Sequence, residues 1–208
     1  MRLNEELIYR QTSTYTELVC QISPKTLYNR MKITNTYKKY KLTKNIFIKE
    51  LNSHLIEFTH NINAKIIHIS NKDKENLFSI SLQTPPSNSK GIPHILEHMV
   101  LCGSKKFKLK DPFFYIRRRS LNTFMNAMTG LDFTCYPAGS EIEKDFYNLL
   151  QVYADAVFNP LLTKESFLQE GIRLEFQDQN TKKSLKYKGV VFHEMEGANS
   201  SLEERLHH

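Results

Sequence analysis

His94-Ile95-Leu96-Glu97-His98 is the stretch around which the rest of this sequence can be understood. In an α-helix, side chains four residues apart lie on one face, a turn above each other, so both imidazoles can reach a single metal ion. Glu97 falls at the edge of that face, where a carboxylate can contact a metal-bound water without being a ligand itself. The stretch is therefore a candidate hydrolytic metal site.

The pattern H-x-x-E-H is rare in a chain of this composition. With 8 His and 16 Glu among 208 residues, chance gives about 0.02 matches. The alternative is a pair of helix histidines that bind no metal. The residues around the motif are apolar at helical spacing, which indicates a helix packed on a core rather than a histidine-rich loop. They are Ile95, Leu96, Met99, Val100 and Leu101.

Composition limits the class of protein. A chain of 208 residues with 40% hydrophobic content suits one or two domains with a real core. No apolar run approaches the roughly 18 residues that span a bilayer, and residues 1–6 resemble neither a signal peptide nor a transit peptide. Cys20, Cys102 and Cys135 fit no disulfide framework and no C-x-x-C pair. We therefore predict a cytoplasmic location and no membrane partner.

The net charge of +7 is unevenly distributed. Residues 25–49 carry eight Lys/Arg and no acid, and residues 105–119 carry seven against Asp111 alone. Such clusters can bind nucleic acid, but they can equally form a solvated basic surface that attracts acidic peptides. Because no nucleic-acid-binding motif accompanies them, nucleic acid is not the expected partner.

The first half of the chain predicts an extension followed by strands. Residues 1–30 show a loose helical pattern and residues 31–50 are lysine-rich, so residues 1–50 are expected to form an N-terminal extension or arm before a domain at 51–208. Period-two patterns predict strands, joined as an antiparallel meander. These strands cover residues 54–59, 64–69 and 76–82, and the H-x-x-E-H helix follows, with Pro93 in its first turn.

The second half predicts mostly helices. A short helix is expected from Asp111 to about Arg119, then two extended segments at 121–128 and 132–137. A capping box, Ser140 with Glu143, predicts the start of a long helix that ends at Asn159-Pro160. Further segments are a helix from Thr163 to about Phe176 and a last segment at 187–197. The order predicts an α+β fold in which helices pack on one face of an antiparallel sheet.

A catalytic zinc site needs a third protein ligand. By chemistry the candidates are several carboxylates and four histidines, which are His54, His60, His68 and His193. Glu194 is favoured because it lies in the apolar stretch 189–195, where an unpaired carboxylate would be costly to bury. The neighbouring His193 competes with it.

Several further segments, in consistent order, make the chain resemble the inverted-zincin metallopeptidases of the insulinase/pitrilysin superfamily, and its presequence-protease branch most closely. The resemblance runs from about residue 54 to the end. The segments that carry it are His94–Ser104, Ser120–Thr129, Thr134–Pro137, Lys144–Asn148, Gln169–Gly171 and Tyr187–Met195.

The resemblance implies a role for each matching residue. His94, His98 and Glu194 match the ligands of Zn²⁺, and Glu97 matches the general base that activates the zinc-bound water. Asn126 and Ala127 match a sheet edge that holds substrate backbone as an added strand. For Asn126 the alternative is a buried turn asparagine.

Two other glutamates, Glu170 and Glu175, are expected on the helix surface or as support for a ligand rather than as ligands.

The resemblance implies a zinc metalloendopeptidase domain that hydrolyses unfolded peptides. Enzymes of this branch are similar to one another in having four related domains in two halves, of which this chain matches part of the first. Three interpretations follow. The chain is a peptidase domain that acts alone or with a separately encoded C-terminal half, or a truncated zinc-binding remnant or subunit without activity of its own. The third interpretation is a peptide- or nucleic-acid-binding module with a vestigial metal site.

Overall fold

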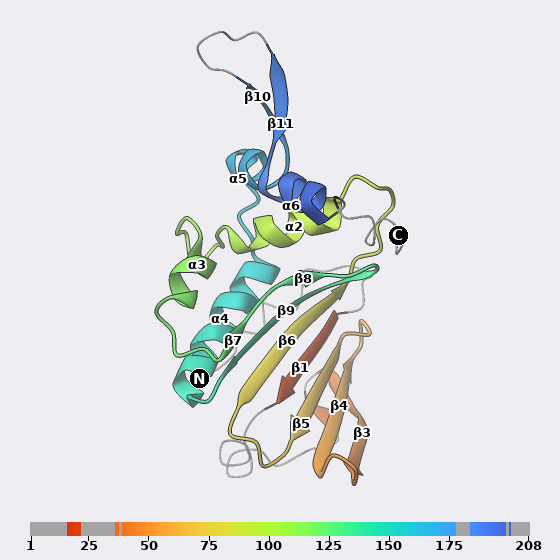
Figure 1. The fold of residues 1–208 in the computed structure, drawn as a ribbon. Coiled ribbons are helices and arrows are strands. Elements are labelled where there is room, and N and C mark those ends of the chain that lie inside the picture. Colours follow the sequence, from red (N-terminus) through yellow and green to blue (C-terminus); the bar gives the residue numbers. More distant parts are fainter. Residues whose placement is uncertain (1–15, 22–35, 38, 178–183, 199, 201–208) are drawn as a thin grey trace.

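A large open sheet organises the molecule in the computed structural model, which describes residues 16–21, 36–37, 39–177, 184–198 and 200. The strands follow one another in the order β2-β3-β4-β5-β1-β6-β9-β7, and β8 also pairs with β9 (Figure 1). Their bounds are β1 Thr16–Gln21, β2 Thr36–Tyr37, β3 Tyr40–Ile48, β4 Ser53–His60, β5 Lys65–Ser70, β6 Asn76–Gln83, β7 Phe124–Met125, β8 Met128–Thr129 and β9 Phe133–Ser140.

Helices and a separate hairpin complete the described fold. The helices are α2 Ile92–Leu101, α3 Pro112–Arg117, α4 Glu143–Phe158, α5 Lys164–Glu170 and α6 Val190–Ala198, and the hairpin pairs β10 Arg173–Phe176 with β11 Leu185–Lys188. This arrangement confirms the predicted α+β class. Within the described part of the chain, no helix is both long and apolar enough to cross a membrane.

The three strands predicted from period-two patterns are present as β4, β5 and β6. The predicted meander is wrong in one connection, because β1 lies between β5 and β6. Leu18 of β1 is in register with Ile66 of β5 in a parallel pair and with Ile80 of β6 in an antiparallel pair. The alternation of apolar residues in β5 and β6 does not reveal that β1, from a distant part of the chain, lies between them.

The N-terminal region also differs from its prediction. The helical expectation is wrong for residues 16–21, which form β1, because pairing on both sides outweighs a loose helical pattern. The rest of that pattern lies outside the described residues. Residues 40–48, expected in a linker or arm, form β3 and pair with β4. The sheet therefore continues across the expected boundary at residue 51.

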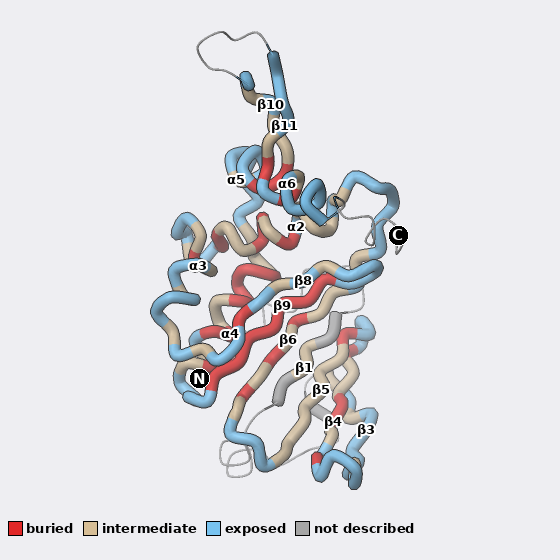
Figure 2. Tube along the Cα trace, viewed as in Figure 1, coloured by how far each residue is buried: buried red, intermediate tan, exposed pale blue. Residues whose placement is uncertain are grey.

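The core lies between α4 and the strands β6 and β9. Phe78 of β6 meets Phe146 and Tyr153 of α4 edge to face, with ring centroids 5.7 and 5.4 Å apart. Ile80 and Leu149 are also almost fully buried. Figure 2 shows this buried band running along β9, β6 and α4. Because α4 presents apolar residues at helical spacing to the sheet, it fixes the platform on which α2 rests.

Two helix boundaries correct the sequence prediction. Ser140 does not cap α4: it ends β9, its hydroxyl donates to the Leu121 carbonyl (3.1 Å) and accepts from the Ile142 amide (3.2 Å). Thr163 does cap α5, since its hydroxyl accepts from the Ser166 amide at 3.1 Å. That helix ends at Glu170 rather than continuing to Phe176, and the chain turns into the hairpin that projects from the top of Figure 1.

Candidate metal centre

Helix α2 carries the H-x-x-E-H motif, as predicted. It begins after Gly91, whose backbone is left-handed with φ of 68°, a conformation that glycine adopts without strain. Pro93 stands in the first turn, where a missing amide hydrogen has no cost. Met99 and Val100 are buried beneath the helix, so its opposite face, with the two histidines, is turned away from the core.

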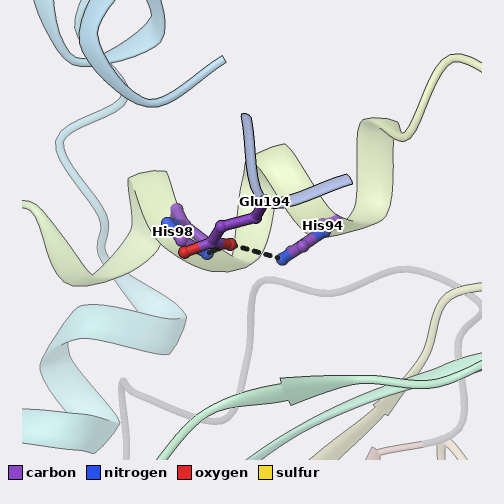
Figure 3. Close-up of side chains that lie close together, drawn as sticks. All are labelled: His94, His98 and Glu194. Atoms are coloured by element: carbon purple, nitrogen blue, oxygen red, sulfur yellow. Dashed lines mark ion pairs between the residues drawn. The ribbon is translucent and has the colours of Figure 1, made fainter. Parts of the chain in front are cut away.

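Glu194 of α6 reaches over this face of α2. Its Oε2 atom lies 3.5 Å from Nε2 of His94 and 3.3 Å from Nε2 of His98. Figure 3 shows the carboxylate extending from α6 between the two imidazole rings. One ligand atom from each of the three residues lies within 4.8 Å of the others. The residue that the sequence favoured as third ligand is therefore brought to both histidines by the fold.

The spacing of these atoms suits a small tetrahedral cation. Metal–ligand bonds of about 2.0–2.2 Å in a tetrahedral zinc site place ligand atoms about 3.3–3.6 Å apart, which matches both measured separations. Two imidazole nitrogens and one carboxylate oxygen are also a donor set that zinc accepts in hydrolytic sites, where the fourth position stays open. The donor chemistry and the geometry fit the expected metal.

Glu170, the last residue of α5, supports one of the histidines. Its Oε2 lies 3.1 Å from Nδ1 of His98, and the residue is buried. Gln169 donates to the other carboxylate oxygen at 2.9 Å. A carboxylate on Nδ1 favours the tautomer with a proton on that nitrogen, which leaves the Nε2 lone pair free to bind a metal ion between His98 and Glu194. The sequence motif Gln169-Glu170-Gly171 contained this residue but no signal of its partner.

Glu97 has a different environment from the histidines. It is buried on the side of α2 that faces β8, and its Oε2 accepts a hydrogen bond of 2.6 Å from the Thr129 hydroxyl. It is not part of the three-residue cluster. The structure thus separates a carboxylate that can act on water from one that can bind a metal.

The position of α6 depends on a close contact between two segments of the backbone, one at Gly189 and one at Gly171. A Cβ atom at Gly189, just before α6, would overlap the carbonyl oxygen of Gly171, just after α5. A Cβ at Gly171 would in turn lie 3.2 Å from a methyl group of Ile95 in α2. Because both crossing residues are glycines, α5, α2 and the base of the hairpin can approach closely enough for Glu194 to reach the histidines.

The alternative ligands are elsewhere. His193 points to Glu196 at 3.3 Å rather than to the cluster. His54 and His60 lie on β4, against the rings of Phe47 and Tyr40 respectively, and His68 lies on β5. Among the described residues, none of these four belongs to the cluster.

The two thiols near the site are poor nucleophiles. Burial, with a contribution from the Glu170 charge, raises the pKa of Cys102 to about 12. Burial also raises the pKa of Cys135, and the Glu97 charge acts in the same direction. Both side chains are free cysteines. Since the thiolate is the reactive and metal-binding form, the site chemistry rests on the imidazoles and carboxylates.

Comparison with known proteins identifies the family of this chain. The sequence profile of the insulinase family, peptidase family M16, matches residues 82–202 and so covers every residue of the cluster. The chain belongs to the insulinase family of peptidases. Membership in the insulinase family confirms the resemblance predicted from the ordered motifs, and it connects the chain with enzymes that act on peptide bonds.

Individual relatives of this insulinase-family chain include enzymes named presequence protease. The mitochondrial presequence protease of Mus musculus is 49% identical over 153 residues, covering 73% of this chain and 15% of that protein. The enzyme of the same name from Kluyveromyces lactis is 44% identical over 167 residues, covering 79% and 17%. The chain thus spans less than a fifth of the length of these relatives.

A solved structure shares the fold of this insulinase-family chain. Pitrilysin aligns with a TM-score of 0.53 and 20% identity, over 61% of this chain and 14% of that one. At this identity the likeness concerns the fold alone, which it confirms.

Asn126 and Ala127 connect β7 and β8, the last strands of the described sheet on this side. The Asn126 amide donates to the Pro137 carbonyl at 3.1 Å, and Pro137 has no N–H to return. The side chain of Asn126 is exposed, so the alternative of a buried turn asparagine is wrong. The Asn126 carbonyl in turn accepts from the Tyr153 hydroxyl at 3.3 Å, so both backbone groups of Asn126 are already paired. Substrate binding at this edge of the sheet remains a prediction.

Proposed function

We propose that this chain is the metal-binding domain of a zinc-dependent endopeptidase that hydrolyses unfolded peptides. The observation that carries the proposal is the meeting of His94, His98 and Glu194 at tetrahedral ligand spacing. The buried Glu97 lies on the same helix but outside the cluster. A purely structural metal site would have no use for a carboxylate in that place.

In the proposed reaction, the metal ion and the side chains of the protein have different tasks. When bound, zinc lowers the pKa of a coordinated water toward about 7 and polarises a carbonyl group. Glu97 accepts the proton of the attacking water and delivers it to the leaving amine, which preserves the proton balance of hydrolysis. Glu170 holds the imidazole of His98 in the tautomer whose Nε2 faces the metal position.

The substrate class follows from the sheet edge beside α2. β7 and β8 form the edge of the described sheet, with Asn126 and Ala127 between them, and an extended peptide can add to a sheet edge through backbone hydrogen bonds. Recognition of that kind requires an unfolded segment and little sequence specificity. Unfolded peptides are therefore the proposed substrates, and the mode of binding supports cleavage within a chain.

The alternative is zinc binding without turnover. It is favoured by the exposure of the Glu194 side chain, which is 51%. We keep the cytoplasmic location as part of the proposal, on the basis of the three cysteines without a pairing pattern.

The test is cleavage of an unstructured fluorogenic peptide by the purified chain with zinc, beside the Glu97→Gln variant, with zinc content measured on both. We expect one zinc per chain in both proteins, and a loss of turnover of about 100-fold or more in the variant, the scale of a general-base contribution. Undiminished turnover in Glu97→Gln would refute the role of Glu97. Zinc at one per chain without turnover in either protein would favour the alternative.

A further inference from the structure

Glu97 needs a defined orientation to act as a base. A carboxylate has two oxygens, and only a position within hydrogen-bond reach of the attacking water is productive. The residue is buried, with 6% of its surface exposed, so bulk solvent does not orient the carboxylate. The hydrogen bond that the structure gives to it comes from Thr129 of β8, with 2.6 Å between Oγ1 and Oε2. A short bond from a hydroxyl to a carboxylate is among the stronger kinds.

Thr129 is itself held firmly. It is in register with Thr134 across β8 and β9, and the turn between them is closed by the Gly130 amide, which donates to the Phe133 carbonyl at 2.8 Å. A β-branched side chain in a strand has few accessible χ1 rotamers. The hydroxyl that meets Glu97 is therefore a fixed donor, whereas a solvent water would be a mobile one.

The bond also joins two parts of the site. Thr129 follows Asn126 and Ala127 on the edge strand proposed to receive the substrate, while Glu97 lies on α2 between the two histidines. With Oε2 engaged by Thr129, Oε1 is the oxygen left for the water. The strand that would bind the peptide thus also sets the direction of the base.

We propose that Thr129 is a positioning residue that orients the Glu97 carboxylate and couples it to the substrate-binding edge. This inference rests on the proposed function and deepens it, because nothing in the sequence motif distinguished Thr129 from its neighbours. Thr134 offers a matched control: it is the cross-strand partner of Thr129, but its hydroxyl bonds to Thr84 at 2.8 Å instead.

The kinetic test compares Thr129→Val, Thr129→Ser and Thr134→Val in the zinc-loaded chain. Valine keeps the shape of threonine and removes the hydroxyl, whereas serine keeps the hydroxyl. We expect Thr129→Val to lower kcat by about 10–100-fold, the scale of a misplaced catalytic group, with KM and zinc content unchanged. Thr129→Ser should recover most of kcat, and Thr134→Val should leave it unchanged. Equal kcat in Thr129→Val and the parent would overturn the inference without touching the proposed function.

A second readout is independent of turnover. In zinc-free protein, urea unfolding is measured for Thr129→Val, Glu97→Ala and the double variant. Since the hydroxyl serves the carboxylate, Thr129→Val should lower the unfolding midpoint clearly in the parent and much less in the Glu97→Ala background. The same shift in both backgrounds would overturn the inference. If the parent chain shows no turnover, this cycle still decides the contact, so a failure of the proposed function and a failure of the positioning role are distinguishable.

Discussion

The two helices that meet at the candidate metal site have very different surroundings. Helix α2 rests on the core, with Glu97, Met99 and Val100 buried, whereas in α6, Val190–Ala198, the buried residue is Val191. The side chains of His94 and His98 are 25% and 21% exposed, but that of Glu194 is 51% exposed. In Figure 2 α2 carries buried segments, whereas most of α6 and the outer part of the hairpin are exposed.

The difference teaches how the site is assembled. Hydrophobic burial fixes the two histidines without any metal, because α2 is part of the packed core. Glu194 depends on a thin layer made by α5, α6 and the base of the hairpin. Elements with few buried apolar groups open at low free energy, so a bound metal ion would itself contribute to holding α6 against α2.

The largest expected effect is in the core. Phe146→Ala removes a side chain with no exposed surface and should lower the free energy of unfolding by about 3–5 kcal/mol. Leu174→Ala on the projecting hairpin, where the side chain is 57% exposed, should change it by about 0.5 kcal/mol or less. Urea unfolding of the zinc-free proteins measures both. Equal losses would show that the hairpin is as much a part of the cooperative unit as α4.

The next largest effect is expected on zinc affinity, when the backbone contact that positions α6 is disturbed. Gly189→Ala places a methyl group against the Gly171 carbonyl, an overpacking that costs about 1–3 kcal/mol and displaces the helix that carries Glu194. We expect weaker zinc binding, measured by competition with a chromogenic chelator. Gly197→Ala is the matched control, because its Cβ would meet nothing within 4 Å. Similar zinc affinity in both variants would mean that the crossing of the two glycines does not position Glu194.

The smallest effect concerns the support of His98. Glu170→Gln keeps the shape of the side chain but weakens its hold on Nδ1, and should reduce zinc affinity by about 10–100-fold. The control is Glu175→Gln, since Glu175 pairs at 2.7 Å with both Arg173 and Lys188 on the hairpin, away from the histidines. We expect less than a twofold change for that variant. An equal loss in the two variants would contradict a specific role for Glu170.

Prediction from the sequence succeeded where the pattern is local. The helix at His94 to His98, strands β4 to β6 and the cap at Thr163 follow from spacing, alternation and capping chemistry. It failed where a distant segment decides the outcome. Strand β1 is inserted between β5 and β6. Ser140 has the spacing of a capping box, but it ends β9 and its hydroxyl donates to the Leu121 carbonyl.

The candidate site divides in the same way. The helical period by itself places His94 and His98 on one face of α2 and Glu97 at its edge, because four residues make about one turn. Only the tertiary structure decides that Glu194 rather than His193 meets them, that Glu170 holds His98, and that Thr129 contacts Glu97. These contacts join segments far apart in the chain, and their geometry depends on how α5, α6 and β8 pack around α2, which no local spacing encodes.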